Sequence, residues 1–169
     1  YPVNMMAGFS AEAIIAALGG SLTPLIESIK MGKIRGIAAL VGCNNPKVVQ
    51  DKNHVEMTKA LIKKDILVIE TGCSAIACAK AGLLLPDAAD MAGEGLKSIC
   101  KSLGIPPVLH MGSCVDISRI LVVATSIANE LDVDISDLPV AAAAPEWMSE
   151  KAVSIGAYAV ASGIFTLLG

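Results

Sequence analysis

Short apolar runs alternate along this chain with longer stretches in which apolar residues recur at helical spacing. The apolar runs predict buried strands at residues 35–41, 66–71, 107–111 and 139–144. The remaining stretches predict helices at 53–64, 74–83 and 116–131, a helix that Pro86 opens and that runs to residue 103, and a final helix from near Glu146. Strands that alternate with helices in this way are typical of right-handed crossovers and a parallel sheet.

Two further helices are expected before this alternating part. Ser10 is placed to cap the first, over residues 11–18, and the second begins at Thr23 and ends at Gly32. The 169 residues suit one domain with its own core, and no linker or low-complexity run divides them. The expected fold class is therefore α/β, with residues 1–169 forming a single Rossmann-like, three-layer αβα domain around a mainly parallel sheet.

Composition and charge exclude several classes of protein. Hydrophobic residues make up 54% of the chain and aromatic residues 3%, which suits parallel strands buried under helices. The net charge of -3 is spread without a basic stripe, so we expect no nucleic-acid partner. The most apolar stretch, between Arg119 and Glu130, is shorter than the roughly 20 residues that a membrane span needs. No secretory leader pattern opens the chain, and we expect a cytoplasmic protein with reduced thiols.

Three of the five cysteines occupy the same place in the repeating strand–helix unit. Cys43, Cys73 and Cys114 each follow a predicted strand and precede a helical pattern. The carboxyl ends of parallel strands line one edge of a sheet, so we expect the three thiols to converge there on one metal or metal cluster. Thiolates prefer zinc, iron–sulfur clusters or copper(I), and structural zinc usually takes ligands from a C-x-x-C pair, which this chain lacks. One ligand from each unit favours a larger cluster.

The remaining cysteines and the two histidines each allow a structural interpretation. Cys100 is expected to pack in the core, and Cys78 is interpreted as structural, with a role behind the cluster ligands as the alternative. His54 opens a helix and is expected to be a solvated or capping residue. His110, at a strand end, is interpreted as a near-core histidine, with orientation of a substrate or sulfide through a ring N–H as the alternative.

Several other side chains near the cysteines also allow two interpretations. Asn44, Asn45 and Asp116 suit hydrogen bonds around a cluster, but polar residues also fill turns, and Asp116 is placed to cap the helix that follows it. Trp147 is expected to anchor the start of the final helix by packing, and Lys80 to be a solvated or sheet-edge cation.

Four long motifs carry a resemblance that covers essentially the whole chain. The strings VGCNNPK, ETGCSAIACAKAGLL, PPVLHMGSCVDISRIL and APEWMSEKAVSIGAYAVASGIF resemble the C-terminal portion of the anaerobic nickel–iron–sulfur carbon monoxide dehydrogenase catalytic subunit, in the carbon monoxide dehydrogenase and hybrid-cluster protein superfamily. The resemblance implies an oxidoreductase that interconverts carbon monoxide and carbon dioxide with water at a nickel–iron–sulfur cluster. It implies that Cys43 and Cys73 ligate iron and that Cys114, the catalytic cysteine, ligates nickel.

Members of this family are several times longer, so the resemblance implies that this chain is part of a longer subunit and supplies about half of the cluster ligands. A histidine, two cysteines and further iron–sulfur clusters are expected from preceding segments, and an acid–base histidine and lysine from outside residues 1–169. The family also implies a ferredoxin-type electron carrier and a homodimer. The isolated chain is expected to be inactive.

Two other functions stay open. One is a hybrid-cluster, hydroxylamine reductase-like oxidoreductase, against which the string GSCVDISR argues and which nickel content would separate from the first. The other is a catalytically inactive, truncated scaffold domain, which the incomplete ligand set favours.

Overall fold

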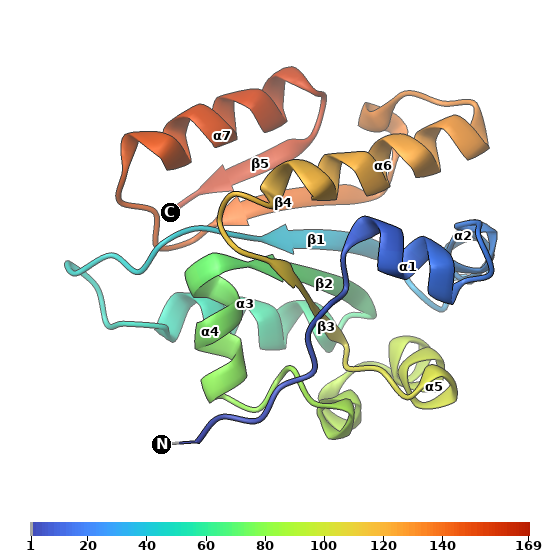
Figure 1. Ribbon diagram of the computed structural model, residues 1–169, viewed down its shortest axis with the longest axis horizontal. Coiled ribbons are helices and arrows are strands. Elements are labelled where there is room, and N and C mark those ends of the chain that lie inside the picture. Colours follow the sequence, from blue (N-terminus) through green and yellow to red (C-terminus); the bar gives the residue numbers. More distant parts are fainter. Residues whose placement is uncertain (1) are drawn as a thin grey trace.

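A single five-stranded sheet with helices on both faces organises the molecule (Figure 1). The computed structural model describes residues 2–169. All four strand pairs are parallel, and the order across the sheet is β3-β2-β1-β4-β5, which confirms the predicted α/β class. The strands are β1 (Gly36–Leu40), β2 (Ile66–Thr71), β3 (Val108–Gly112), β4 (Val140–Ala144) and β5 (Phe165–Leu168).

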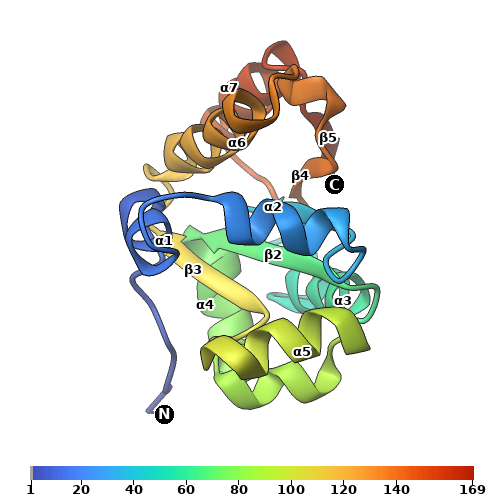
Figure 2. The same cartoon turned by 90° about the vertical axis from the view of Figure 1, so that its right-hand side faces the viewer.

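The helices form one layer on each face of the sheet. In Figures 1 and 2, α3, α4 and α5 cover one face, and α1, α2, α6 and α7 lie on the other. The helices are α1 (Ala11–Ala17), α2 (Thr23–Lys30), α3 (Lys52–Ile62), α4 (Gly72–Lys80), α5 (Glu94–Leu103), α6 (Ile117–Leu131) and α7 (Glu150–Ala161), with short 3-10 segments η1 (Pro86–Met91) and η2 (Ile135–Asp137). The Ser10 side chain caps α1 by accepting the Ala13 N–H at 3.2 Å, as predicted.

The four predicted strands lie within one residue of β1 to β4, but β5 was not predicted. This strand has four residues, pairs with β4 at one end of the sheet, and leaves Phe165 73% exposed. A short edge strand with little buried surface carries almost no period-2 signal, so the pattern did not separate it from the preceding helix.

Two predicted helices differ from the observed ones: the first is divided in two, and the second begins later. The helix expected from Pro86 to residue 103 is split into η1 and α5, because the chain passes close to Asp65 at Gly93, where a β-carbon would lie 2.4 Å from Asp65 Oδ1. The same carboxylate accepts the Leu96 N–H at 2.8 Å and satisfies a backbone donor in the first turn of α5. The final helix begins at Glu150 rather than near Glu146.

The core lies on both faces of the central strands. Every residue of β1 is buried, and Leu40, Ile62, Val68 and Leu96 pack in one cluster with essentially no exposed surface. Burying each such aliphatic side chain stabilises the fold by roughly 1.5–3 kcal/mol. Cys100 belongs to the same cluster at 1% exposure, which confirms its predicted place in the core.

The strand order reverses direction between β1 and β4. From β1 the chain moves outward to β2 and β3, and then returns across the sheet through α6 to β4 and β5. Ligands of open α/β sheets bind outside the carboxyl ends of the strands at such a switch point. The three predicted cysteines follow β1, β2 and β3 at this edge. Within residues 2–169, no helix combines the length and the apolar composition needed to cross a bilayer.

Candidate metal centre

The three predicted cysteines lie at the carboxyl ends of three neighbouring strands. Cys43 follows β1, Cys73 is the second residue of α4 directly after β2, and Cys114 follows β3. Cys73 is exposed, and Cys43 and Cys114 are half-buried. All five cysteines of the chain are free thiols. The sheet therefore places three thiols from distant parts of the sequence at one edge.

The turn between β2 and α4 packs directly against Cys114. A β-carbon at Gly72 would lie 3.1 Å from the Cys114 Cβ and 3.3 Å from its backbone nitrogen. Gly72 also has a φ of +64°, in the left-handed region that glycine adopts without strain. Glycine at this position thus permits both the turn and the close approach of the Cys73 and Cys114 segments.

A lysine that the sequence analysis did not single out contacts one of the thiols. Lys151 Nζ donates to Cys114 Sγ at 3.2 Å from the first turn of α7. This hydrogen bond, and the charges of the Cys114, Cys43 and Cys73 sulfurs, raise the pKa of Lys151. An acid–base lysine was expected outside residues 1–169, whereas the structure places a lysine of this chain beside Cys114. Nothing in the local sequence signals this position, because α7 reaches the cysteines only through the fold.

The loop that carries Cys43 is held from behind by a buried histidine. His54 is fully buried on α3, and its Nε2 donates to the Cys43 carbonyl oxygen at 2.9 Å. The prediction of a solvated or capping residue was therefore wrong. His54 and Thr58 lie one turn apart on the face of α3 that packs against β2 and α4, and tertiary contact rather than position at the helix start decides the environment.

Polar side chains tie the same loop to the segment that leads into α7. Asn44 Nδ2 donates to Asp51 Oδ1 at 2.9 Å and to Glu146 Oε2 at 3.2 Å, and Asn45 Nδ2 donates to the Trp147 carbonyl at 3.1 Å. The asparagines thus fill the structural role that was left open for them. Trp147 packs against the core as expected, although it lies before α7 rather than in it.

Glu146 is a further residue that the sequence analysis missed as part of the site. Its carboxylate is 1% exposed, and Oε1 accepts the Asn53 N–H at the start of α3 at 3.0 Å. A carboxylate beside a helix N-terminus satisfies an unbonded amide and is favoured by the helix dipole. Lys80, half-exposed, forms an ion pair with Asp51, which fits its predicted place as a cation near the sheet edge.

The loop that carries Cys114 is closed on itself by Asp116. Its Oδ2 accepts the Ser113 N–H at 2.7 Å and the Ser113 hydroxyl at 2.9 Å, and these bonds lower the pKa of Asp116. Asp116 stands at the N-cap position of α6 but makes no capping bond to that helix. Gly112 allows this closure, because a β-carbon there would lie 2.5 Å from Asp116 Oδ2.

The two remaining candidates have different outcomes. Cys78 is fully buried and its thiol donates to Thr58 Oγ1 at 3.4 Å, which agrees with a structural role. His110 is half-buried on β3, and its carbonyl accepts the Phe9 N–H at 3.2 Å, which ties the N-terminal segment to the sheet. Orientation of a substrate by the His110 ring stays a prediction.

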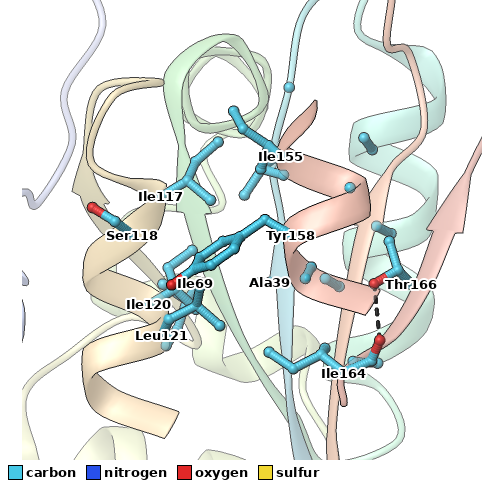
Figure 3. Close-up of a pocket in the computed structure, with 18 of the residues that line it drawn as sticks. Ala39, Ile69, Ile117, Ser118, Ile120, Leu121, Ile155, Tyr158, Ile164 and Thr166 are labelled. Carbon is cyan, nitrogen blue, oxygen red and sulfur yellow. Dashed lines mark hydrogen bonds between the residues drawn. The ribbon is translucent and has the colours of Figure 1, made fainter. Parts of the chain in front are cut away.

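An apolar pocket of about 370 Å³ lies beside Cys43 and Cys114, and Figure 3 shows part of its lining. Cys43, Cys114 and Lys151 line one end of it. The rest is lined mainly by aliphatic side chains of β1, β4, α6 and α7, including Ile117 and Ile155 in Figure 3. The run of alanines in β4, residues 141–144, leaves the space that larger side chains would fill.

The donor set fits a metal group larger than one ion. Among residues 2–169, no three His, Cys, Asp or Glu side chains stand close enough together to ligate a single metal ion. A cluster takes one thiolate for each of several metal atoms, so its ligands do not share one coordination sphere. Three half-buried or exposed thiols beside a lysine cation are suited to such a group, because the ammonium offsets the negative charge of thiolate ligands.

Comparison with known proteins agrees with this geometry. The model of the Prismane/CO dehydrogenase family matches residues 3–169. The chain belongs to this family. It is 69% identical over 164 residues to carbon monoxide dehydrogenase 1 of Methanosarcina acetivorans, a match that covers 97% of this chain and 26% of the relative.

Solved structures of the Prismane/CO dehydrogenase family share the fold. The as-isolated, nickel-free carbon monoxide dehydrogenase from Thermococcus sp. AM4, produced without the CooC maturase, is 61% identical with a TM-score of 0.96, over 98% of this chain and 26% of that one. Carbon monoxide dehydrogenase IV from Carboxydothermus hydrogenoformans is 53% identical with a TM-score of 0.93, over 98% of this chain and 28% of that one. The chain thus spans about a quarter of the length of the relatives that it matches.

Proposed function

We propose that this chain is the cluster-binding part of a carbon monoxide dehydrogenase, in which Cys43 and Cys73 ligate iron and Cys114 ligates nickel. The observation that supports it most is three thiols at three neighbouring strand ends, with the Lys151 ammonium 3.2 Å from Cys114 Sγ and near enough to Cys43 and Cys73 for their charges to raise its pKa. Membership of the Prismane/CO dehydrogenase family, and relatives named carbon monoxide dehydrogenase, support the same reaction. The reaction converts CO and H₂O into CO₂, two protons and two electrons.

Lys151 is the residue of this chain best placed to act on a substrate oxygen. Its ammonium has three N–H donors, and one of them bonds Cys114 Sγ. The other two can donate to an oxygen of carbon dioxide, on which negative charge increases as the carbon accepts electrons. A fixed cation at that point stabilises the charge without reorganising water. Lys151 also holds a proton at Nζ beside the reacting atoms.

The surrounding side chains fix the segments that carry the ligands, and an apolar pocket lies beside them. His54, Asn44 and Glu146 hold the Cys43 loop, and Asp116 holds the Cys114 loop. When bound, the nickel–iron–sulfur cluster would supply the site for the carbon, the activation of water and the acceptor of two electrons. The apolar pocket beside it suits carbon monoxide, since an uncharged diatomic molecule loses little on leaving water, whereas ions lose much.

The whole protein extends this proposal beyond residues 1–169. We propose a cytoplasmic homodimer that passes electrons through further iron–sulfur clusters to a ferredoxin-type carrier. The histidine and two cysteines that complete the ligand set come from preceding segments of the longer subunit. The length of the relatives, about four times that of this chain, supports the existence of such segments.

A substitution of the nickel ligand tests the assignment in the full-length subunit, purified anaerobically. We expect Cys114→Ala to remove CO oxidation and to lower the nickel content while the protein stays folded, because only one ligand is lost. Cys100→Ala is the matched control, since that thiol packs in the core and should leave nickel and activity in place. Undiminished CO oxidation by Cys114→Ala would refute the assignment. Iron without nickel in the wild-type subunit, with hydroxylamine reduction, would favour the hybrid-cluster alternative instead.

A further inference from the structure

The Ser149 side chain lies against one of the three cysteines at the sheet edge. Ser149 Oγ is 3.9 Å from Cys43 Sγ, a distance at which a hydroxyl still bonds to the large sulfur atom. Both residues are half-buried, and they are 106 positions apart in the sequence. The contact therefore follows from the fold, which brings the start of α7 over the loop after β1.

The Ser149 hydroxyl is not engaged by the helix that it precedes. Ser149 is the N-cap residue of α7 and has an extended backbone, but its side chain makes no capping bond to residues 150–161. A serine at this position ordinarily accepts a backbone N–H from the first turn, as Ser10 does at the start of α1. The departure from this pattern leaves the hydroxyl proton and oxygen of Ser149 available to Cys43.

Contacts on both sides of Ser149 hold it in this place. Two residues before it, the Trp147 carbonyl oxygen accepts Nδ2 of Asn45 from the loop after β1, at 3.1 Å. Two residues after it, Lys151 Nζ donates to Cys114 Sγ at 3.2 Å. The backbone of Ser149 is thus tied at both ends to the cysteine edge, and its short side chain loses little rotamer freedom in this position.

The chemistry of the sulfur sets the direction of the hydrogen bond. A cysteine that ligates a metal is a thiolate, which has no proton and can only accept. The hydroxyl of Ser149 must then donate to Cys43 Sγ, and a bond to a charged acceptor is stronger than one between neutral groups. Hydrogen bonds to cluster sulfurs help to set the reduction potential of an iron–sulfur cluster. An added electron increases the negative charge on the sulfurs, so a donor stabilises the reduced cluster more than the oxidised one.

We propose that Ser149 donates a hydrogen bond to the Cys43 sulfur and thereby raises the reduction potential of the cluster that this sulfur ligates. With Lys151 on Cys114, the start of α7 then supplies one donor to each of two cysteine ligands. Ser149 acts through a ligand and not on the substrate, so it is a positioning residue. The inference rests on the proposed function only in requiring a cluster at Cys43, and it requires neither nickel nor CO.

A redox titration of the full-length subunit, purified anaerobically and followed by electron paramagnetic resonance, tests this role. The signal of interest is the one that Cys43→Ala removes. Ser149→Ala should lower the potential of that signal, by about 59 mV for one electron if the reduction equilibrium changes about tenfold. Ser149→Thr keeps a hydroxyl and should restore a potential close to that of wild type.

Ser162→Ala is the matched control, because Ser162 lies at the opposite end of the same helix. Its hydroxyl donates to the Tyr158 carbonyl oxygen at 2.9 Å and contacts none of the cysteines in residues 2–169. This variant should leave the potential unchanged. Ser149→Ala should also fold like wild type, because the serine makes no capping bond that alanine would remove.

Two results of the titration would overturn the proposal. One is an unchanged potential in Ser149→Ala. The other is an equal shift in Ser149→Thr, which would assign the effect to packing and not to the hydroxyl. If a variant fails to fold, a high-resolution structure of the wild-type subunit with its cluster decides instead. Ser149 Oγ bonded to Cys43 Sγ would support the proposal, and Ser149 Oγ bonded to an N–H of the first turn of α7 would refute it.

These outcomes are separate from those of the proposed function. A subunit that holds an iron–sulfur cluster at Cys43 but lacks nickel and CO oxidation would refute the carbon monoxide dehydrogenase proposal, and the Ser149 titration would still apply. An unchanged potential in Ser149→Ala, in a subunit that oxidises CO, would refute only the role of Ser149. A subunit with no cluster at Cys43 would overturn both.

Discussion

Replacing Glu70 with glutamine should change how the stability of the chain depends on pH. Burial raises the pKa of Glu70 from 4.5 to about 7, and this effect outweighs the hydrogen bond from the Thr58 hydroxyl, which lowers it. The folded chain therefore keeps the proton at pH values where the unfolded chain has lost it. The stability that the protonated group contributes is present below pH 4.5 and is lost as the pH rises to about 7. Glutamine does not ionise in this range, so the Glu70→Gln variant should not lose this stability as the pH rises.

The size of the effect follows from the shift. One pKa unit corresponds to about 1.4 kcal/mol, so the shift of Glu70 corresponds to about 3 kcal/mol between acidic and mildly alkaline pH. The free energy of unfolding of Glu70→Gln, relative to wild type, should rise by about that amount across this range. Cys78 does not add to the slope, because burial and the nearby Glu70 charge raise the pKa of that thiol far above the range.

Urea unfolding at several pH values, followed by circular dichroism, measures this difference. Glu56→Gln is the control, since an exposed glutamate on α3 should leave the pH profile parallel to that of wild type. If Glu70→Gln and wild type lose stability in parallel between pH 4.5 and about 7, Glu70 is ionised in the folded chain and the reasoning is refuted.

Three further substitutions test the packing and the site. Gly72→Ala should unfold at lower urea concentration than Gly82→Ala, because both glycines have positive φ but only Gly72 would meet a neighbour, at 3.1 Å; equal midpoints would refute the close approach. Leu96→Ala should lower the free energy of unfolding by about 2–5 kcal/mol, because Leu96 is fully buried. Leu103 is 53% exposed on the same helix, so Leu103→Ala should lower it far less. Equal losses, measured by urea unfolding, would contradict the described core. Lys151→Met in the full-length subunit should lower the rate of CO oxidation by about 100-fold or more with nickel and iron retained, and an unchanged rate would remove Lys151 from the site.

The sequence predicted best where the structure is built from local pattern. Strands β1 to β4 and the places of Cys43, Cys73 and Cys114 followed from apolar runs and from the residues that end them. It predicted poorly where burial depends on a distant partner. His54 begins a helix whose first turn is polar in sequence, yet it is fully buried because α4 and β2 cover that face.

The sequence by itself determines the alternation of strands and helices. It also determines that a cysteine follows each of three strands. Both depend on neighbours along the chain, whose side-chain periodicity fixes local structure. Only the tertiary structure decided that Lys151 and Glu146 belong to the site, because the reversal of strand order at β1 and β4 brings the start of α7 over the cysteine edge.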